Sequence, residues 1–208
     1  MKRAVFFDID GVLINGMHAR PELQRRWDTS LMEDMGVDPD LFTQEFIFDV
    51  FVKKVSIGQM SVIEALERHL PGLGYKGSPM VFHHYWLTRD SVFNEPLLQV
   101  IRSLKARDDI RLFIATNQEH LRATWLWSHL GLSELFEDIF YSARARSRKP
   151  DRGFFDFVMK RIGPQAQMPL FFDDTPKVVE GARAYGWETV LFNTTEDVIR
   201  HPWIAERL

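Results

Sequence analysis

Cysteine is absent from the 208 residues, so the chain forms no disulfide bond, thiolate nucleophile or zinc–thiolate site. Long apolar runs are also missing. The first run, Ala4 to Phe7, stops at Asp8 and is too short for a membrane span or a signal peptide. The net charge of -3 gives no support for binding nucleic acid or a membrane surface. By elimination, we expect a cytoplasmic protein with neither of these partners.

Alternating strand and helix patterns dominate the sequence outside one long insertion. Apolar runs predict strands at residues 3–9, 110–115, 138–141, 169–173 and 188–192. Amphipathic patterns predict helices at residues 95–107, 118–130, 152–162 and 176–185. This alternation indicates an α/β fold: a Rossmann-like three-layer sandwich whose parallel sheet has helices on both faces.

A helical insertion separates the first two strands. Its patterns predict helices at residues 21–35, 39–54, 61–70 and 79–88. Pro21 and Pro39 suit the first turn of a helix, and Ser61 to Glu64 has the form of a capping box. We expect residues 16–91 to form an α-helical cap domain, and residues 1–15 and 92–208 to form the catalytic core.

Two carboxylates stand close together at the end of the first apolar run. Side-chain alternation along the predicted strand places Asp8 and Asp10 on the same side of its C-terminal end. Open α/β sheets bind their ligands at that end. Two crowded acids are costly there unless a cation or a proton shared with a substrate relieves them. The pair predicts a metal-assisted reaction on an anion; the alternative is a pair of turn or cap aspartates after a buried strand.

Four short motifs stand at the C-terminal ends of different predicted strands: Asp8-Ile9-Asp10-Gly11, Thr116-Asn117, Lys149-Pro150-Asp151 and Asp173-Asp174. With these motifs, the chain resembles the haloacid dehalogenase-like hydrolase superfamily, in the subfamily with a helical cap. The segment from Phe171 to Asp174, with Glu180-Gly181-Ala182, is similar to the sugar-phosphate phosphatases of that group.

The resemblance implies a role for each acidic residue. Asp8 matches the nucleophile that forms an aspartyl-phosphate, and Asp10 matches the general acid and base. Mg²⁺ is the cofactor of this family. Asp8, the backbone carbonyl of Asp10 and the Asp174 carboxylate match its ligands, while Asp173 is expected to orient them. The order of Asp173 and Asp174 as ligands stays open.

The same resemblance implies a phosphate-binding set. Thr116 matches the hydroxyl donor to the transferring phosphoryl group, beside the backbone amide of Asn117. Lys149 matches the lysine that steadies Asp8 and the phosphoryl oxygens. Two positions depart from the family pattern: Val178 stands where Asn or Asp is usual, and Arg146 stands where glycine is usual.

We therefore expect a Mg²⁺-dependent phosphatase acting on a small phosphorylated metabolite, with a sugar phosphate as the narrower expectation. A phosphomutase shares every core motif and stays an alternative. A 2-haloacid dehalogenase needs no metal and lacks the second aspartate, so Asp10 argues against it. A non-catalytic binding protein of the same fold is a further alternative. Nothing in the sequence indicates the oligomeric state.

Overall fold

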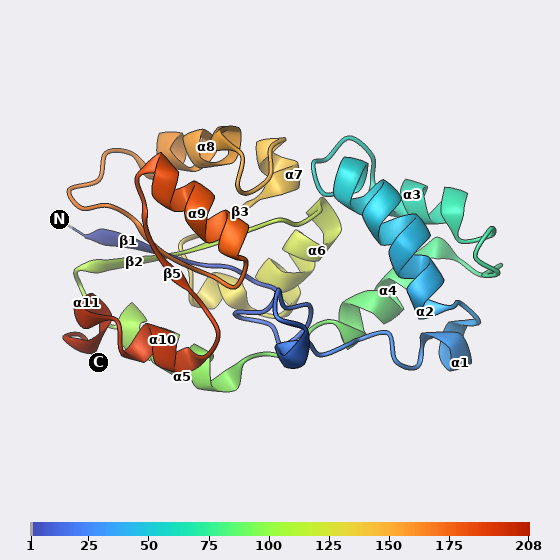
Figure 1. The fold of residues 1–208 in the computed structure, drawn as a ribbon, viewed down its shortest axis with the longest axis horizontal. Coiled ribbons are helices and arrows are strands. Elements are labelled where there is room, and N and C mark those ends of the chain that lie inside the picture. Colours follow the sequence, from blue (N-terminus) through green and yellow to red (C-terminus); the bar gives the residue numbers. More distant parts are fainter. Residues whose placement is uncertain (1) are drawn as a thin grey trace.

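The computed structural model describes residues 2–208 and contains a five-stranded parallel sheet (Figure 1). Its strands are β1 (Arg3–Phe7), β2 (Ile110–Thr116), β3 (Asp138–Tyr141), β4 (Leu170–Asp173) and β5 (Glu188–Leu191). Their order across the sheet is β3-β2-β1-β4-β5, which puts the N-terminal strand in the centre. The predicted α/β fold is confirmed, but the first strand ends at Phe7 and not at residue 9.

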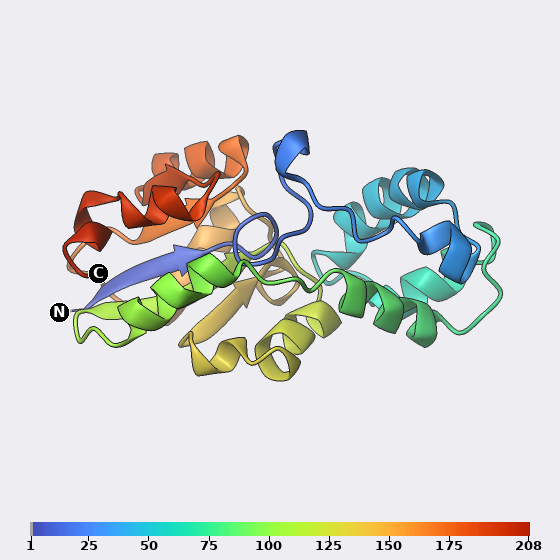
Figure 2. The same ribbon diagram turned by 90° about the horizontal axis from the view of Figure 1, so that it is seen from below.

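Both faces of the sheet are buried because side chains alternate along each strand. On β1, Val5 and Phe7 join one apolar core, whereas Ala4 and Phe6 join the other. The helices that cover the first face are α5 (Glu95–Lys105), α6 (His120–Thr124), η3 (Trp125–His129), α10 (Thr195–Ile199) and α11 (Pro202–Ala205). The second face is covered by α8 (Arg152–Ile162) and α9 (Pro176–Tyr185) (Figures 1 and 2). Two short elements complete the core: η4 (Leu132–Glu134) and α7 (Ser142–Ala145).

The chain reverses its direction across the sheet at the centre. From β1 it proceeds outward through β2 to β3, and then returns to place β4 on the other side of β1. Loops that follow β1 and β4 therefore diverge, and the crevice between them is where open α/β sheets bind ligands.

A helical unit lies between β1 and α5 in the sequence and forms a second lobe in Figures 1 and 2. Its elements are η1 (Pro21–Leu23), α1 (Leu31–Met35), α2 (Pro39–Leu41), η2 (Phe42–Val55), α3 (Val62–His69) and α4 (Pro79–Arg89). The unit has its own apolar core, in which Phe42, Phe46 and Phe82 are fully buried. The wide helix η2 carries hydrogen bonds between residues five apart, as in a π-helix. No helix within residues 2–208 has the length and apolar character needed to span a bilayer.

The predicted helix over residues 21–35 is wrong. The chain makes one turn at Pro21–Leu23, runs without helix through residues 24–30, and becomes helical again at Leu31. Tertiary contacts explain the interruption: the Trp27 ring stacks on Trp86 at a centroid distance of 5.4 Å, and the buried Asp28 carboxylate pairs with Arg26. These contacts outweigh the local helix propensity of the segment.

Candidate active site

Asp8 directly follows the central strand, and its amide donates a hydrogen bond to the Phe172 carbonyl of β4. The Asp8 carboxylate is fixed through one oxygen: Oδ1 accepts the Ile9 amide at 2.7 Å and lies 2.9 Å from Lys149 Nζ. Oδ2 accepts no hydrogen bond from the described residues. Burial raises the pKa of Asp8 to about 7; the Lys149 charge opposes this effect, while the carboxylates of Asp173 and Asp10 add to it.

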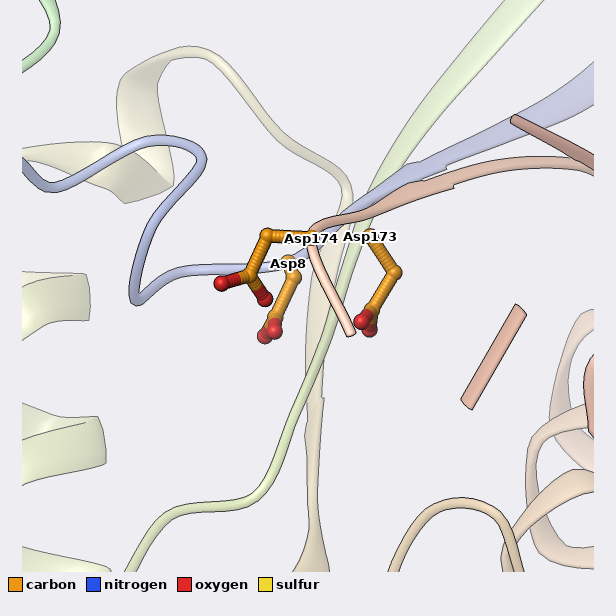
Figure 3. Close-up of side chains that lie close together, drawn as sticks. All are labelled: Asp8, Asp173 and Asp174. Atoms are coloured by element: carbon orange, nitrogen blue, oxygen red, sulfur yellow. The ribbon is translucent and has the colours of Figure 1, made fainter. Parts of the chain in front are cut away.

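Asp8, Asp173 and Asp174 form a buried cluster of carboxylates, with one oxygen from each lying within 4.8 Å of the others. Figure 3 shows the three side chains side by side where β1 and β4 end. Burial raises the pKa of Asp173 and also that of Asp174. Lys149 Nζ lies 2.6 Å from Asp173 Oδ2, so this one cation contacts two of the three acids.

The donor set of this cluster fits a divalent hard cation. Carboxylate oxygens are the ligands that Mg²⁺ prefers. Three carboxylates beside one lysine leave an excess of buried negative charge, which adds to the effect of burial on their pKa values and would be offset by such a cation.

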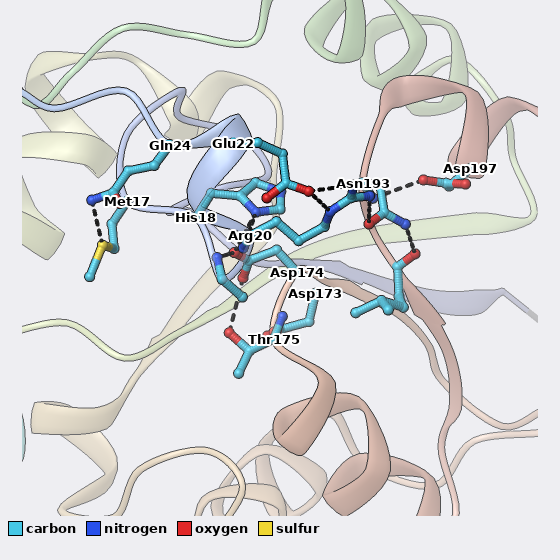
Figure 4. A network of polar contacts seen from close by, with 12 residues as sticks. Met17, His18, Arg20, Glu22, Gln24, Asp173, Asp174, Thr175, Asn193 and Asp197 are labelled. Atoms are coloured by element: carbon cyan, nitrogen blue, oxygen red, sulfur yellow. Dashed lines mark hydrogen bonds and ion pairs between the residues drawn. The ribbon is translucent and has the colours of Figure 1, made fainter.

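Asp174 is held by the segment that leads out of the core toward the helical unit. Its Oδ2 accepts the Ala19 amide at 2.6 Å and lies 3.6 Å from His18 Nδ1, and Figure 4 shows the wider network. Gly11 makes this close packing possible: its φ is +76°, and a Cβ at this position would lie 2.5 Å from Asp174 Oδ2.

The predicted phosphate-binding residues gather on the other side of Asp8. Thr116 ends β2, and its hydroxyl makes no hydrogen bond within the described residues. Lys149 is 2% exposed, and its Nζ also donates to the Ala115 carbonyl. Asn117 clamps the backbone of Lys149 with its side chain: Oδ1 accepts the Lys149 amide at 2.8 Å, and Nδ2 donates to its carbonyl. This side-chain contact was not anticipated.

The Asp10 carboxylate points into different surroundings from that of Asp8. Because β1 ends at Phe7, the prediction that strand alternation orients the two residues does not apply. Arg122 forms a two-point ion pair with Asp10, at 2.7 Å and 3.1 Å, and Gln118 Nε2 donates to the same carboxylate. Arg122 also lies 3.2 Å from the Asp90 carboxylate. Burial raises the pKa of Asp90 to about 6.

Sequence reasoning missed Arg122, which is 6% exposed on α6. A basic residue on the buried side of an amphipathic helix needs an acidic partner. The position of Arg122 in the helix pattern was therefore the one sign in the sequence that it pairs with an acid. The partner belongs to another part of the chain, so the helix pattern alone could not identify it.

At Arg146, where the family pattern has glycine, the backbone keeps the conformation that a glycine would favour. Arg146 is the one non-glycine residue with positive φ (53°) within residues 2–208, and it ends α7. Val178, at the other departure, is buried in the core beside α8.

A cavity of about 460 Å³ lies between the core and the helical unit, within the usual size range of small-molecule sites. The core contributes Asp10, Asn117, Gln118 and Arg122 to its lining. The helical unit contributes aromatic and aliphatic side chains from the segment around Trp27, from η2 and from α4. The predicted general acid therefore faces this cavity.

Comparison with known proteins identifies the family. A model described as haloacid dehalogenase-like hydrolase matches residues 2–186. The chain belongs to this family and is a hydrolase, as the four motifs predicted. A phosphoglycolate phosphatase from Rhodospirillum rubrum is 27% identical over 206 residues, covering 93% of this chain and 80% of that protein. Drimenol cyclase drtB from Aspergillus calidoustus is 39% identical over 66 residues, which are 32% of this chain and 12% of the cyclase.

Solved structures share the fold at low sequence identity. The HAD family enzyme BT-2542 from Bacteroides thetaiotaomicron, in complex with magnesium and inorganic phosphate, has a TM-score of 0.71 and 18% identity, covering 91% of this chain and 93% of its own. The L-2-haloacid dehalogenase from Xanthobacter autotrophicus has a TM-score of 0.63 and 17% identity, covering 91% and 76%. One fold thus carries both phosphate-binding and dehalogenating proteins, so the function must be argued from the site.

Proposed function

We propose that this protein is a Mg²⁺-dependent phosphatase that hydrolyses a small phosphate monoester through an aspartyl-phosphate on Asp8. The observation that carries the proposal is the state of the Asp8 carboxylate. One of its oxygens is fixed by Lys149 and the Ile9 amide, and the other is free of hydrogen bonds, beside two further acids. A fixed carboxylate with one free oxygen is suited to nucleophilic attack.

In the first step, Asp8 Oδ2 bonds to phosphorus and the bond from phosphorus to the ester oxygen breaks. Asp10 gives a proton to the departing oxygen, which leaves as an alcohol. Arg122 and Gln118, which hold the Asp10 carboxylate, orient it for this transfer. Thr116 and the Asn117 amide hold the phosphoryl oxygens, with Lys149 neutralising charge beside them.

In the second step, Asp10 takes a proton from water, and the water oxygen attacks the phosphorus of the aspartyl-phosphate. The bond from phosphorus to Asp8 breaks, inorganic phosphate leaves, and the Asp8 carboxylate is restored. Asp10 has then regained the proton that it gave in the first step.

The carboxylates of Asp8 and Asp174, with the backbone carbonyl of Asp10, would hold the cation, and Asp173 would orient them through Lys149. When bound, Mg²⁺ supplies positive charge that offsets the repulsion between the attacking carboxylate and the phosphate. We also propose that residues 16–91 serve as the cap over the core of residues 1–15 and 92–208, excluding bulk water from the phosphoenzyme.

The phosphoglycolate phosphatase relative supports hydrolysis of a small phosphate ester. Hydrolysis of p-nitrophenyl phosphate with Mg²⁺, with EDTA and with Asp8→Asn tests the proposal. We expect turnover that needs Mg²⁺ and disappears in the variant. Turnover of the wild type in EDTA, or unchanged turnover of Asp8→Asn, would contradict the proposal.

A further inference from the structure

We propose that the alcohol part of the substrate is a hydrocarbon, aliphatic or aromatic, and not a polyol such as a sugar. This inference rests on the proposed phosphatase function and deepens it. Its basis is the lining of the 460 Å³ cavity, which the sequence did not reveal.

The cavity is where the alcohol part must lie. Asp10, the proposed proton donor to the leaving oxygen, lines it, and so does Asn117, the proposed phosphate ligand. A phosphate bound at Asp8 therefore directs its ester group past these two residues toward the helical unit. The walls of that unit contact the alcohol and select it.

One wall is a stripe of side chains along η2 that is apolar except for Thr43. Helices with hydrogen bonds between residues five apart align positions four or five apart, and Thr43, Ile47, Phe48, Phe51 and Val52 follow this spacing in the cavity lining. Another row of the same helix, which includes Phe42 and Phe46, is buried in the apolar core of the unit. The helix therefore presents hydrophobic side chains to the cavity as well as to its own core.

Aromatic rings adjoin this stripe. Trp27 and Trp86 both line the cavity and stack on one another, and Phe51 packs on Trp86 at a centroid distance of 5.4 Å. Phe48 is part of the cavity lining and is 52% exposed. A large exposed aromatic residue in a concave apolar site is typical of a surface that a ligand covers.

The charged residues of the lining are mostly paired with one another. Arg26 pairs with Asp28 and Asp40, while Arg122 pairs with Asp10 and Asp90. Arg25 is the exception: it is exposed and has no acidic partner within residues 2–208.

Gln118 Oε1, Asp90 Oδ1 and Arg122 Nε of the lining also lack a hydrogen-bond partner within the described residues, but these three atoms are buried. Apart from the Thr43 hydroxyl, the walls formed by η2, Trp27 and Trp86 therefore offer few exposed polar groups to substrate hydroxyls. Each unpaired hydroxyl that is buried against apolar walls weakens binding, whereas each methylene strengthens it. The cavity accordingly favours hydrocarbon over sugar.

The kinetic test compares ethyl, butyl and hexyl phosphate with glucose 6-phosphate, which has the same number of carbon atoms as the hexyl ester. We expect kcat/KM to rise about fourfold for each added methylene that enters the cavity. Hexyl phosphate should exceed glucose 6-phosphate by roughly tenfold or more. A flat or falling alkyl series, or a preference for glucose 6-phosphate, would overturn the inference.

The variant Phe48→Ser tests the wall itself, and Met80→Ala is its control. Phe48 lies outside the buried apolar cores, and Met80 is 59% exposed on α4, outside the cavity lining. We expect Phe48→Ser to lower kcat/KM for hexyl phosphate roughly tenfold and to leave ethyl phosphate nearly unchanged, whereas Met80→Ala changes neither. Equal losses on both esters would contradict the proposed contact.

Calorimetric titration separates this inference from the phosphatase proposal, because it requires no turnover. Hexylphosphonate and ethylphosphonate, titrated into the Mg²⁺-loaded protein, should differ in affinity by roughly 250-fold, about fourfold for each of the four added methylenes. Chain-length-dependent binding without hydrolysis of any ester would contradict the phosphatase and leave the apolar pocket standing. Hydrolysis of the esters with no gain in affinity from the longer chain would support the phosphatase proposal and contradict the apolar pocket.

Discussion

Removing divalent cations should make the folding stability of this protein fall as the pH rises. The cause is the acidic cluster, where burial raises the pKa of Asp8 from 3.8 to about 7. In the folded state this carboxyl keeps a proton that it releases in the unfolded chain. Its stabilising contribution is therefore complete below about pH 4 and is lost as the pH rises through about 7. The pKa shift corresponds to about 4 kcal/mol.

The neighbouring acids act in the same direction. Burial raises the pKa of Asp173 and of Asp174, and it raises that of Asp90 to about 6. A loss of about 4 kcal/mol is a large part of the 5–15 kcal/mol typical of folded proteins. For a chain of this length it corresponds to a fall in Tm of roughly 10 °C over the whole pH range of the titration.

Mg²⁺ should reverse the trend because it binds the ionised carboxylates. Its stabilising effect is therefore larger at about pH 8 than at about pH 5. Thermal unfolding in EDTA and in Mg²⁺, followed from about pH 5 to about pH 8, measures both effects. Asp8→Asn is the control: it removes one of the titrating groups, so the fall in Tm with pH in EDTA should be smaller than in the wild type. A wild-type Tm in EDTA that stays constant or rises with pH would refute the reasoning.

Three further predictions concern single residues. Gly11→Ala should weaken Mg²⁺ binding at least tenfold, because its Cβ would displace the Asp174 carboxylate. Thermal unfolding at increasing Mg²⁺ concentrations measures this loss. The control is Gly131→Ala, where φ is similar and the space is open: it should cost about 1–2 kcal/mol of stability and leave Mg²⁺ binding intact. Lys149→Met leaves two buried carboxylates unpaired, so it should lower the free energy of unfolding by about 3–5 kcal/mol. Urea unfolding in the presence of EDTA measures this change, and a loss below about 1 kcal/mol would argue against the ion pairs. Arg122→Lys should lower kcat on p-nitrophenyl phosphate about tenfold or more with little change in KM, because lysine cannot hold the Asp10 carboxylate at two points. An unchanged kcat would show that Arg122 does not position Asp10 for catalysis.

The sheet could be predicted from the sequence because its signals are local. A strand buried on both faces must be apolar throughout, as Ala4 to Phe7 are, and such runs alternate with amphipathic helices along the core. The motif residues were found in the same way, because each stands next to a strand or within a short distinctive segment. Asp8, Lys149, Asp173 and Asp174 are indeed neighbours in the structure.

The features that could not be predicted all depend on contacts between distant parts of the chain. Gln24, Arg25 and Arg26 are good helix formers, but the stacking of Trp27 on Trp86 and the burial of Asp28 hold residues 24–30 in another conformation. The pairing of Arg122 with Asp10 spans 112 positions, and no local pattern records it. The cavity is likewise formed by segments far apart in the sequence, so its apolar character became visible only in three dimensions.

The central claim is that Asp8 becomes covalently phosphorylated, and mass spectrometry of the acid-quenched enzyme tests it most directly. Protein mixed with Mg²⁺ and p-nitrophenyl phosphate, quenched within the first turnovers and digested, should carry one phosphoryl group on the peptide that contains Asp8. Hydroxylamine should remove this group, as expected for an acyl phosphate, and Asp8→Asn should not acquire it. Steady turnover with no phosphoryl group on that peptide, or with the group on another residue, would contradict the account.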